Sequence, residues 1–468
     1  MLFPTLSFGL FFLIVYAIVW AIDAANEWRK ITLLLASWFF YGAWDARFVA
    51  LLFVSAVANW GIARALMAAG SDRARRMLLA LGVVANLGVL TYFKYAGFFF
   101  EQLTVLVHRL GFARDLPLMQ VVLPVGVSFF TFQAISYLVD VHQRRVRPAP
   151  LLDLMLLMSF FPHLVAGPIV RASDLLPQFR DRPRLSRGAA AAALLLIVWG
   201  LFKKVVIASE LASALVDPAF FDPASHSAFD LLFGAYGYAV QIYCDFSAYS
   251  DMAIGIAALL GYTFPRNFDQ PYRATSLQDF WRRWHISLSS WLRDYLYIPL
   301  GGSRRGAART YLHLFITMLL GGLWHGASWN FVIWGALHGG WLGIERFARR
   351  MRPANWPAPP AWLGLLITFH IVVLGWIFFR AQGLDAAFAY LGAMAHNGWQ
   401  NHLVTPLSLA LIVIGLAMHA MPARLLDGAA MRVRRWPAPL AGTALAAVIL
   451  LIDAMRPDGI APFIYYQF

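Results

Sequence analysis

The sequence predicts an all-α protein, a helical bundle that crosses a membrane many times. Of its 468 residues, 60% are hydrophobic and only 13% are charged, whereas soluble globular proteins carry about 25% charged residues. The deficit extends along the whole chain, and segments 10–22, 189–202 and 403–418 hold no charged side chain. Lipid offers an exposed backbone no hydrogen-bond partner, so a span needs about 20 mostly apolar residues in a helix. We therefore expect a polytopic integral membrane protein with about 11 to 13 transmembrane or re-entrant helices.

The apolar runs place the predicted spans, in chain order, at 2–22, 31–45, 48–66, 77–97, 121–141, 190–208, 228–246, 310–324, 329–347, 361–380, 405–421 and 437–454. Segment 151–167 is apolar but short, and Pro162 and Gly167 favour a broken or re-entrant element there. The N-terminus lacks a basic stretch and its apolar run is long enough to span, so we expect a retained helix. With no repeat and no soluble segment of useful size, one membrane-embedded domain over 1–468 is expected.

The distribution of charged residues indicates the membrane topology of the chain better than it indicates a charged binding partner. The formal charge is +14, but the basic residues lie in short blocks between apolar runs, which is typical of cytoplasmic loops. We therefore expect no nucleic-acid binding. Arg29 and Lys30 follow the first span and no basic residue precedes it, so the N-terminus is expected outside. Lys203 and Lys204 depart from this pattern and are expected to face the protein interior. Cys244 is the only cysteine, which excludes an intramolecular disulfide and a multi-cysteine metal site, and no metal is expected.

Segment 264–309 is the most unusual part of the chain. The helical periodicity of 279–291 predicts an amphipathic helix at the cytoplasmic boundary, with Trp281, Trp284 and His285 on one face. His285 is either part of a tryptophan-anchored surface helix or a functional residue, and periodicity leaves both open. The basic, glycine-rich run 301–306 follows, where Arg304 and Arg305 could bind the phosphates of a nucleotide-like donor. A plain cytoplasmic turn is the alternative, because the run lacks a Walker pattern.

His325 is an ionisable residue in an otherwise apolar segment. Such residues are costly in a membrane and by default functional, and the flanking Gly322 and Gly326 let a ligand or another backbone approach closely. The alternative is an interhelical hydrogen bond. For His338, on the next apolar run, a structural and a catalytic role stay equally open. A polar cluster at 245–251 is expected to be a helix junction that lines a cavity, with Asp245 and Asp251 capping helices or pairing with arginines.

The runs 279–302 and 323–339 resemble the signature regions of the membrane-bound O-acyltransferase family, and 124–137, 162–168 and 243–255 fit the same pattern. The most specific element is Trp324-His325-Gly326 following the Trp-Arg-Arg-Trp-His run at 281–285. The bacterial alginate O-acetyltransferase branch is the most similar, and the D-alanyl transferases of teichoic acid are also similar. The signature core covers about 121–345. Ala248 and Ser303 stand where this branch usually has glycine and asparagine, which leaves the reaction class unchanged but bears on the acceptor.

The resemblance implies a helical bundle with a central tunnel in the bacterial inner membrane. It also implies that His325 is the catalytic histidine and that His285 occupies the position of the family's second active-site residue. It further implies a cytoplasmic thioester donor, acetyl-coenzyme A, and no permanently bound cofactor. The acceptor is then a hydroxyl on the periplasmic side, as in alginate-like exopolysaccharides. Expected partners are that polysaccharide, periplasmic acetyltransferase proteins and membrane lipids.

The chemistry suits these residues. A neutral imidazole in a low-dielectric site can take the acceptor's proton, and general-base help contributes about 10²–10⁴-fold. His285 is the expected hydrogen-bond donor or co-base. The predicted substrate-binding residues are Trp324, Asn330, Asp279 and Trp284, and the predicted donor-binding residues are Arg304 and Arg305. The rivals are a transporter or flippase for an anionic polymer or lipid, D-alanyl transfer to a cell-wall polymer, and a non-catalytic scaffold.

Overall fold

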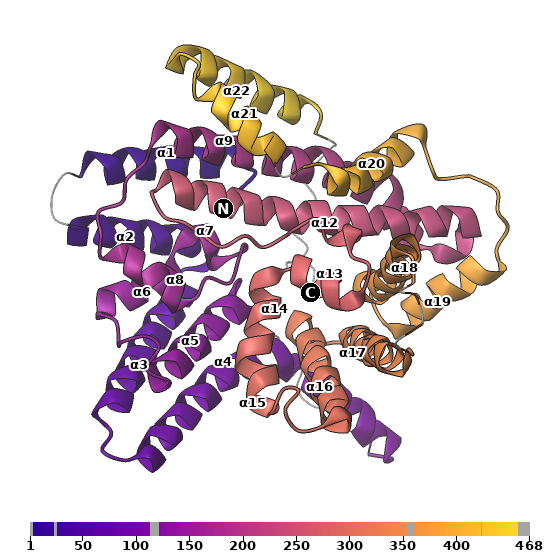
Figure 1. Ribbon diagram of the computed structural model, residues 1–468, viewed down its shortest axis with the longest axis horizontal. Helices are drawn as coiled ribbons and strands as arrows, with labels where there is room; N and C mark the ends of the chain where they lie inside the picture. Colours follow the sequence, from indigo (N-terminus) through magenta and orange to yellow (C-terminus); the bar gives the residue numbers. More distant parts are fainter. Residues whose placement is uncertain are drawn as a thin grey trace. The chain divides into compact units, whose positions relative to one another are not determined.

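The computed structural model describes residues 3–22, 26–112, 121–353, 355, 357, 359–422 and 424–456. Every regular element in these ranges is a helix, which confirms the predicted all-α fold (Figure 1). The chain forms two compact units. The first contains Met1–Ser186 and Ile256–Pro265, and the second contains Arg187–Gly255 and Arg266–Phe468.

The helices of the first unit are α1 (Leu6–Ala21), α2 (Asn26–Asp45), α3 (Arg47–Ala68), α4 (Asp72–Arg109), α5 (Val127–His142), α6 (Leu151–Ser159), α7 (Phe161–Leu164), α8 (Ala172–Leu175) and η1 (Leu176–Phe179). Helices α3, α4 and α5 pack against one another (Figure 1), and the buried amides of Asn59 and Asn86 pair across α3 and α4. The expected broken element at 151–167 is confirmed, since α6 ends at Ser159 and only a four-residue helix follows.

The second unit begins with a helical run of α9 (Arg187–Leu201), η2 (Phe202–Ala208), α10 (Ser209–Leu211), η3 (Ala212–Val216), α11 (Asp217–Phe221) and η4 (Pro223–Ser225), followed by α12 (Ala228–Leu259), whose last turn belongs to the first unit. Next come η5 (Pro271–Arg273), α13 (Leu277–Arg283), α14 (Ile286–Leu292), η6 (Arg293–Tyr297), α15 (Ile298–Leu300), α16 (Ala307–His325) and α17 (Trp329–Met351). The remaining helices are α18 (Ala361–Arg380), α19 (Leu384–His396), α20 (Pro406–Ala417), η7 (Met418–Ala420), α21 (Arg424–Val433) and α22 (Ala438–Ala454).

Several helices suit a lipid environment. Among the described residues, four helical runs are long and apolar enough to cross a membrane: Arg47–Ala68, Asp72–Arg109, Arg187–Phe221 and Ala361–Arg380. Shorter apolar helices are Leu6–Ala21, Pro406–Ala420 and Ala438–Ala454. The predicted apolar spans thus fold as helices, since a helix satisfies its own backbone hydrogen bonds without water.

Two lysines inside the Arg187–Phe221 run pair with carboxylates on α12. Lys203 lies 2.7 Å from Asp251 and 2.6 Å from the Ser247 hydroxyl, and Lys204 lies 2.8 Å from Asp245. Both lysines belong to the π-helical stretch η2, and both are buried, as expected. The predicted helix junction at 245–251 is wrong, because α12 continues through it. The carboxylates pair with lysines in place of the expected arginines, so the helix needs no break to satisfy them.

Candidate active site

His325 is the last residue of α16, at the short turn into α17. The two helices approach so closely that a Cβ at Gly322 would collide with the carbonyl oxygen of Phe331, and a Cβ at Gly326 with the Phe331 ring. Ser328 caps the start of α17, and its hydroxyl accepts a hydrogen bond from the main-chain amide of Asn330 at 3.3 Å. The glycines on either side of His325 therefore permit the close helix pairing that positions its ring.

Aromatic rings surround His325, which is only 4% exposed. The centroid of its ring lies 5.0 Å from that of Trp324, 5.1 Å from Trp334 and 5.2 Å from Phe379, each in an edge-on arrangement. Trp334 comes from α17 and Phe379 from α18, so three helices form this environment. Contacts with these three rings account for the burial of His325.

His285 lies where the predicted amphipathic helix breaks. The expected continuous helix through 279–291 is wrong, because α13 ends at Arg283 and α14 begins at Ile286. His285 between them has a φ of 42°, a left-handed conformation that non-glycine residues seldom adopt. The expected interfacial tryptophans Trp281 and Trp284 are buried. Periodicity missed the break because the side-chain pattern suits a helix on both sides of it.

The His285 ring is fully buried. It stands edge-on to Phe246 of α12, with 4.6 Å between the ring centroids. Burial lowers the pKa of His285 to about 3, because an imidazolium would lose its hydration there. The ring is therefore neutral at physiological pH.

Trp324 brings the two histidines into one cluster. Its ring centroid lies 5.0 Å from that of His325 and 6.1 Å from that of His285. The amphipathic helix expected at the cytoplasmic boundary would hold His285 at the membrane surface, so its pairing with His325 requires segment 279–302 to enter the bundle. The break at His285 does this, since it turns the ring into the core of the second unit.

Asn267 is a site residue that sequence reasoning missed. It is 1% exposed, and its side-chain oxygen lies 3.2 Å from His285 Nδ1 and 2.8 Å from the Ser287 hydroxyl. The sequence signal for it is an uncharged amide between two phenylalanines, Phe264 and Phe268. A buried polar group needs a partner, and here the partner is the histidine.

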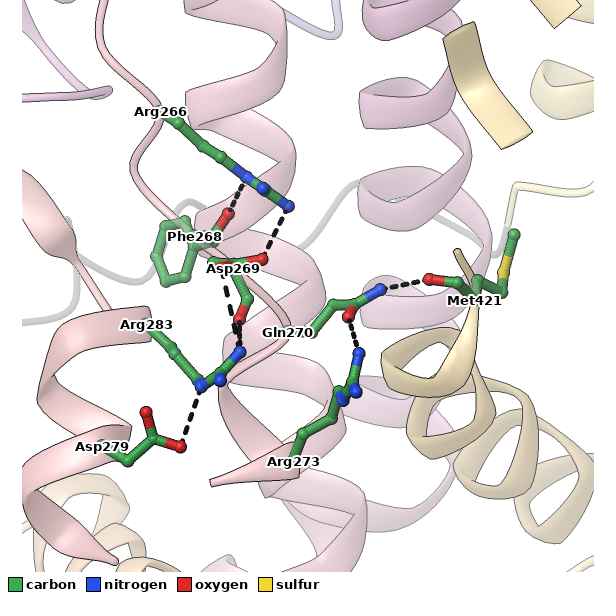
Figure 2. Close-up of polar contacts among 8 residues, drawn as sticks. All are labelled: Arg266, Phe268, Asp269, Gln270, Arg273, Asp279, Arg283 and Met421. Carbon is green, nitrogen blue, oxygen red and sulfur yellow. Dashed lines mark hydrogen bonds and ion pairs between the residues drawn. The ribbon is translucent and has the colours of Figure 1, made fainter. Parts of the chain in front are cut away.

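A polar network holds the segment that leads into this site (Figure 2). Arg283 donates to Asp279 at 3.0 Å and to the carbonyl oxygen of Asp269 at 3.3 Å, and Arg266 forms a 3.0 Å ion pair with Asp269. Gln270 donates to the carbonyl oxygen of Met421. Asp279, predicted to bind substrate, is thus placed as an ion-pair partner of Arg283, and its side chain is about one-third exposed.

Two other predicted substrate-binding residues lie in the core of the second unit. Trp284 is 2% exposed and packs on Trp376, with 4.9 Å between ring centroids. Asn330 donates from its side chain to the carbonyl oxygen of Ala381 at 2.7 Å, which ties α17 to the end of α18. Both side chains support the walls around the histidines.

Arg304 and Arg305 lie in an exposed turn before α16, where Gly301, Gly302 and Gly306 adopt positive φ. α16 has 19 residues, and a helix rises about 1.5 Å per residue, so roughly 28 Å of helix separates this turn from His325. The structure therefore does not bring the two arginines to the histidine cluster. A donor bound here by its phosphates would need a long arm to reach His325.

His338 stands on α17, behind Trp334. Its ring centroid lies 4.6 Å from that of Trp334 and 5.4 Å from that of Trp281. It is fully buried, and neither ring nitrogen has a hydrogen-bond partner in the described ranges. Within the same ranges, no group of three or more His, Cys, Asp or Glu side chains is arranged to hold a metal ion.

Comparison with known proteins gives the class of protein. The model of the membrane-bound O-acyltransferase family matches residues 91–385. The chain is 44% identical to the "Probable alginate O-acetylase AlgI" of Pseudomonas aeruginosa, over 81% of this chain and 72% of that protein. It is 39% identical to the peptidoglycan O-acetyltransferase of Helicobacter pylori, over 79% and 74%. A teichoic acid D-alanyltransferase of Streptococcus thermophilus is 28% identical over 54% and 68%.

The chain belongs to the membrane-bound O-acyltransferase family. It is accordingly a membrane protein and an O-acyltransferase, as the sequence motifs predicted. This result argues against the transporter and the non-catalytic scaffold, because the matching region includes both histidine-bearing runs.

Proposed function

We propose that this protein transfers an acetyl group from a cytoplasmic thioester, acetyl-coenzyme A, to a hydroxyl of an exopolysaccharide on the periplasmic side of the bacterial inner membrane. The observation that carries the proposal is the pair of buried histidines whose rings both contact Trp324. An acyl transfer to a hydroxyl needs a base in a site that excludes water, and this cluster supplies buried neutral imidazole.

His325 is the proposed general base. The acceptor hydroxyl attacks the thioester carbonyl carbon while His325 takes its proton, the carbon–sulfur bond breaks, and the proton then passes to the thiolate. Such base catalysis contributes about 10²–10⁴-fold. His285 is proposed to assist as a second imidazole that hydrogen-bonds the substrate, and Trp324 holds the two rings in place.

The donor side of the proposal rests on Arg304 and Arg305. Their exposed turn carries positive charge and glycines of positive φ, which suits the phosphates of coenzyme A. The distribution of basic residues supports a cytoplasmic position for this turn and an outside N-terminus. No permanently bound cofactor enters the proposed reaction, and periplasmic acetyltransferase proteins would help to place the acetyl group on the polymer.

The acceptor is proposed from the relatives. Proteins whose names include O-acetylation of alginate or peptidoglycan match about four-fifths of the chain, whereas the D-alanyltransferase matches 54%. Acetyl transfer is therefore favoured over D-alanyl transfer. An alginate-like exopolysaccharide is favoured over peptidoglycan by the higher identity of the alginate O-acetylases.

The test is to replace His325 and His285 separately by alanine and to measure O-acetyl groups on the exported polysaccharide. We expect at least a 10²-fold loss for His325→Ala. His396→Ala is the matched control, because His396 is exposed and its ring lies 2.8 Å from the Gly392 carbonyl oxygen of its own helix. Persistent acetylation in a His325→Ala protein that inserts normally would refute the catalytic assignment. The donor is tested by incubating the purified protein with radioactive acetyl-coenzyme A and the polysaccharide. Label on the polysaccharide is then measured.

A further inference from the structure

Asn267 contacts both sides of the backbone break at His285. Its main-chain oxygen accepts a hydrogen bond from the Ile286 amide at 2.9 Å. Its side-chain oxygen accepts from the Ser287 main-chain amide at 3.1 Å and lies 3.2 Å from His285 Nδ1. Its side-chain nitrogen donates to the Ser250 hydroxyl at 3.0 Å. These bonds hold the left-handed residue and the start of α14 to one buried amide.

The contacts define which nitrogen of His285 carries the proton. The main-chain amide of Ser287 can only donate, so the Asn267 side-chain atom that faces it is the oxygen. An amide oxygen has no hydrogen, so the hydrogen in its contact with His285 lies on Nδ1. The Ser287 hydroxyl, 3.4 Å from Nδ1, donates its own hydrogen to the same amide oxygen at 2.8 Å. A neutral imidazole has one N–H. Nε2 of His285 therefore carries a lone pair.

Nε2 of His285 is buried and has no hydrogen-bond partner among the described residues. The ionisable groups on the elements packed around it are Asp245, Asp251, Lys203 and Lys204 on α12 and η2, Asp269, Asp279 and Arg283 on the neighbouring segment, and His325 beyond Trp324. Burial is the one cause that shifts the pKa of His285, and it favours the neutral ring. The hydrogen bond between Nδ1 and Asn267 thus sets the orientation of the ring and of the lone pair on Nε2.

We propose that Asn267 is a positioning residue that keeps the proton of His285 on Nδ1, so that Nε2 accepts a hydrogen bond from a hydroxyl of the acceptor sugar. This inference rests on the proposed function. The reacting hydroxyl gives its proton to His325, and a second hydroxyl of the same sugar donates to His285 without losing its proton. In this tautomer Nε2 cannot donate to the carbonyl oxyanion, so His285 assists as an acceptor.

The tautomer is measured directly by nitrogen NMR of the full-length protein with ¹⁵N-labelled histidine. A His285→Gln variant identifies the signals of His285 by their loss. We expect Nδ1 to be protonated and Nε2 unprotonated near neutral pH. A protonated Nε2 in the wild-type protein would overturn the inference. This measurement does not depend on activity, so it separates a wrong tautomer from a wrong proposed function.

The proposed role of Nε2 as a hydrogen-bond acceptor is tested with Asn267→Asp. The introduced carboxylate still accepts from Nδ1 but raises the pKa of His285, because it stabilises the imidazolium. A protonated ring has no lone pair on Nε2. The ratio of variant to wild-type acetyl transfer is therefore expected to fall as pH drops, by roughly tenfold for each unit below the raised pKa. A donor role for His285 predicts the opposite, a ratio that rises as pH drops.

Asn59→Asp is the matched control, since Asn59 is an equally buried amide that pairs with Asn86 in the first unit. Its pH profile is expected to follow the wild type even where its yield is lower. An Asn267→Asp profile that is flat relative to this control, or that rises at low pH, would overturn the acceptor role. If the wild-type protein transfers no acetyl group to any sugar, the proposed function fails, and the NMR result still decides the tautomer.

Discussion

The pairing of Lys203 with Asp251 predicts a specific pattern of stabilities. Lys203 is 2% exposed at its side chain and Asp251 is 23% exposed, so removal of the carboxylate leaves a buried ammonium with the Ser247 hydroxyl and the face of Tyr243. Breaking a buried ion pair by removing one partner costs about 3–5 kcal/mol. Because Asp251 is partly exposed, we expect the lower end, about 3 kcal/mol, for Asp251→Leu.

The double variant Lys203→Met with Asp251→Leu should recover most of this loss. Replacing a whole buried ion pair by apolar groups is often neutral, so it is expected within about 1 kcal/mol of the wild type. The assay is unfolding of the purified protein in detergent, followed by the fluorescence of its 18 tryptophans. If the double variant is no more stable than Asp251→Leu, the loss does not come from leaving the Lys203 ammonium unpaired, and the reasoning is refuted.

Three further perturbations test the site. Gly326→Ala should destabilise the protein by about 1–3 kcal/mol and abolish acetylation, because the new methyl group collides with Phe331; adding Phe331→Leu should restore part of both, as read by thermal unfolding and O-acetyl content. Asp279→Asn should cost less than about 1 kcal/mol, since its pair with Arg283 is partly exposed; a large loss of transfer at normal stability would instead show that Asp279 binds substrate. Stability should decline as pH falls below about 6.5, the pKa of an unfolded histidine, because the folded pKa of His285 is about 3. The unfolded state then binds the proton more readily. In detergent unfolding curves, His285→Gln should weaken that decline, and an unchanged decline would assign it to other groups.

Hydropathy alone was sufficient to predict the helical fold. The expected span at 361–380 coincides with α18, and 437–454 differs from α22 by one residue. This success has a physical cause, because lipid leaves the backbone no alternative to internal hydrogen bonding. The same pattern located His325, since an ionisable side chain is conspicuous among apolar ones.

Local sequence patterns gave wrong predictions where the ion-pair or hydrogen-bond partner comes from a distant segment of the chain. The polar cluster at 245–251 looked like a helix junction, but the two lysines of η2 neutralise its carboxylates and α12 continues. The break at His285 was missed for the same reason. Its stabilising amide, Asn267, lies 18 positions earlier in the chain, beyond the reach of helical periodicity.

His325 illustrates what the sequence determines and what the tertiary structure determines. The sequence by itself determined that this is a helical membrane protein and that His325 is its most exceptional ionisable residue, because composition and hydropathy follow directly from solvation. Only the tertiary structure decided that His285 joins it through Trp324 and which nitrogen of His285 lacks a hydrogen-bond partner among the described residues. Those facts depend on contacts between α12, α14, α16 and the loop at 267, and hydrogen bonds between distant segments leave no local pattern in the sequence.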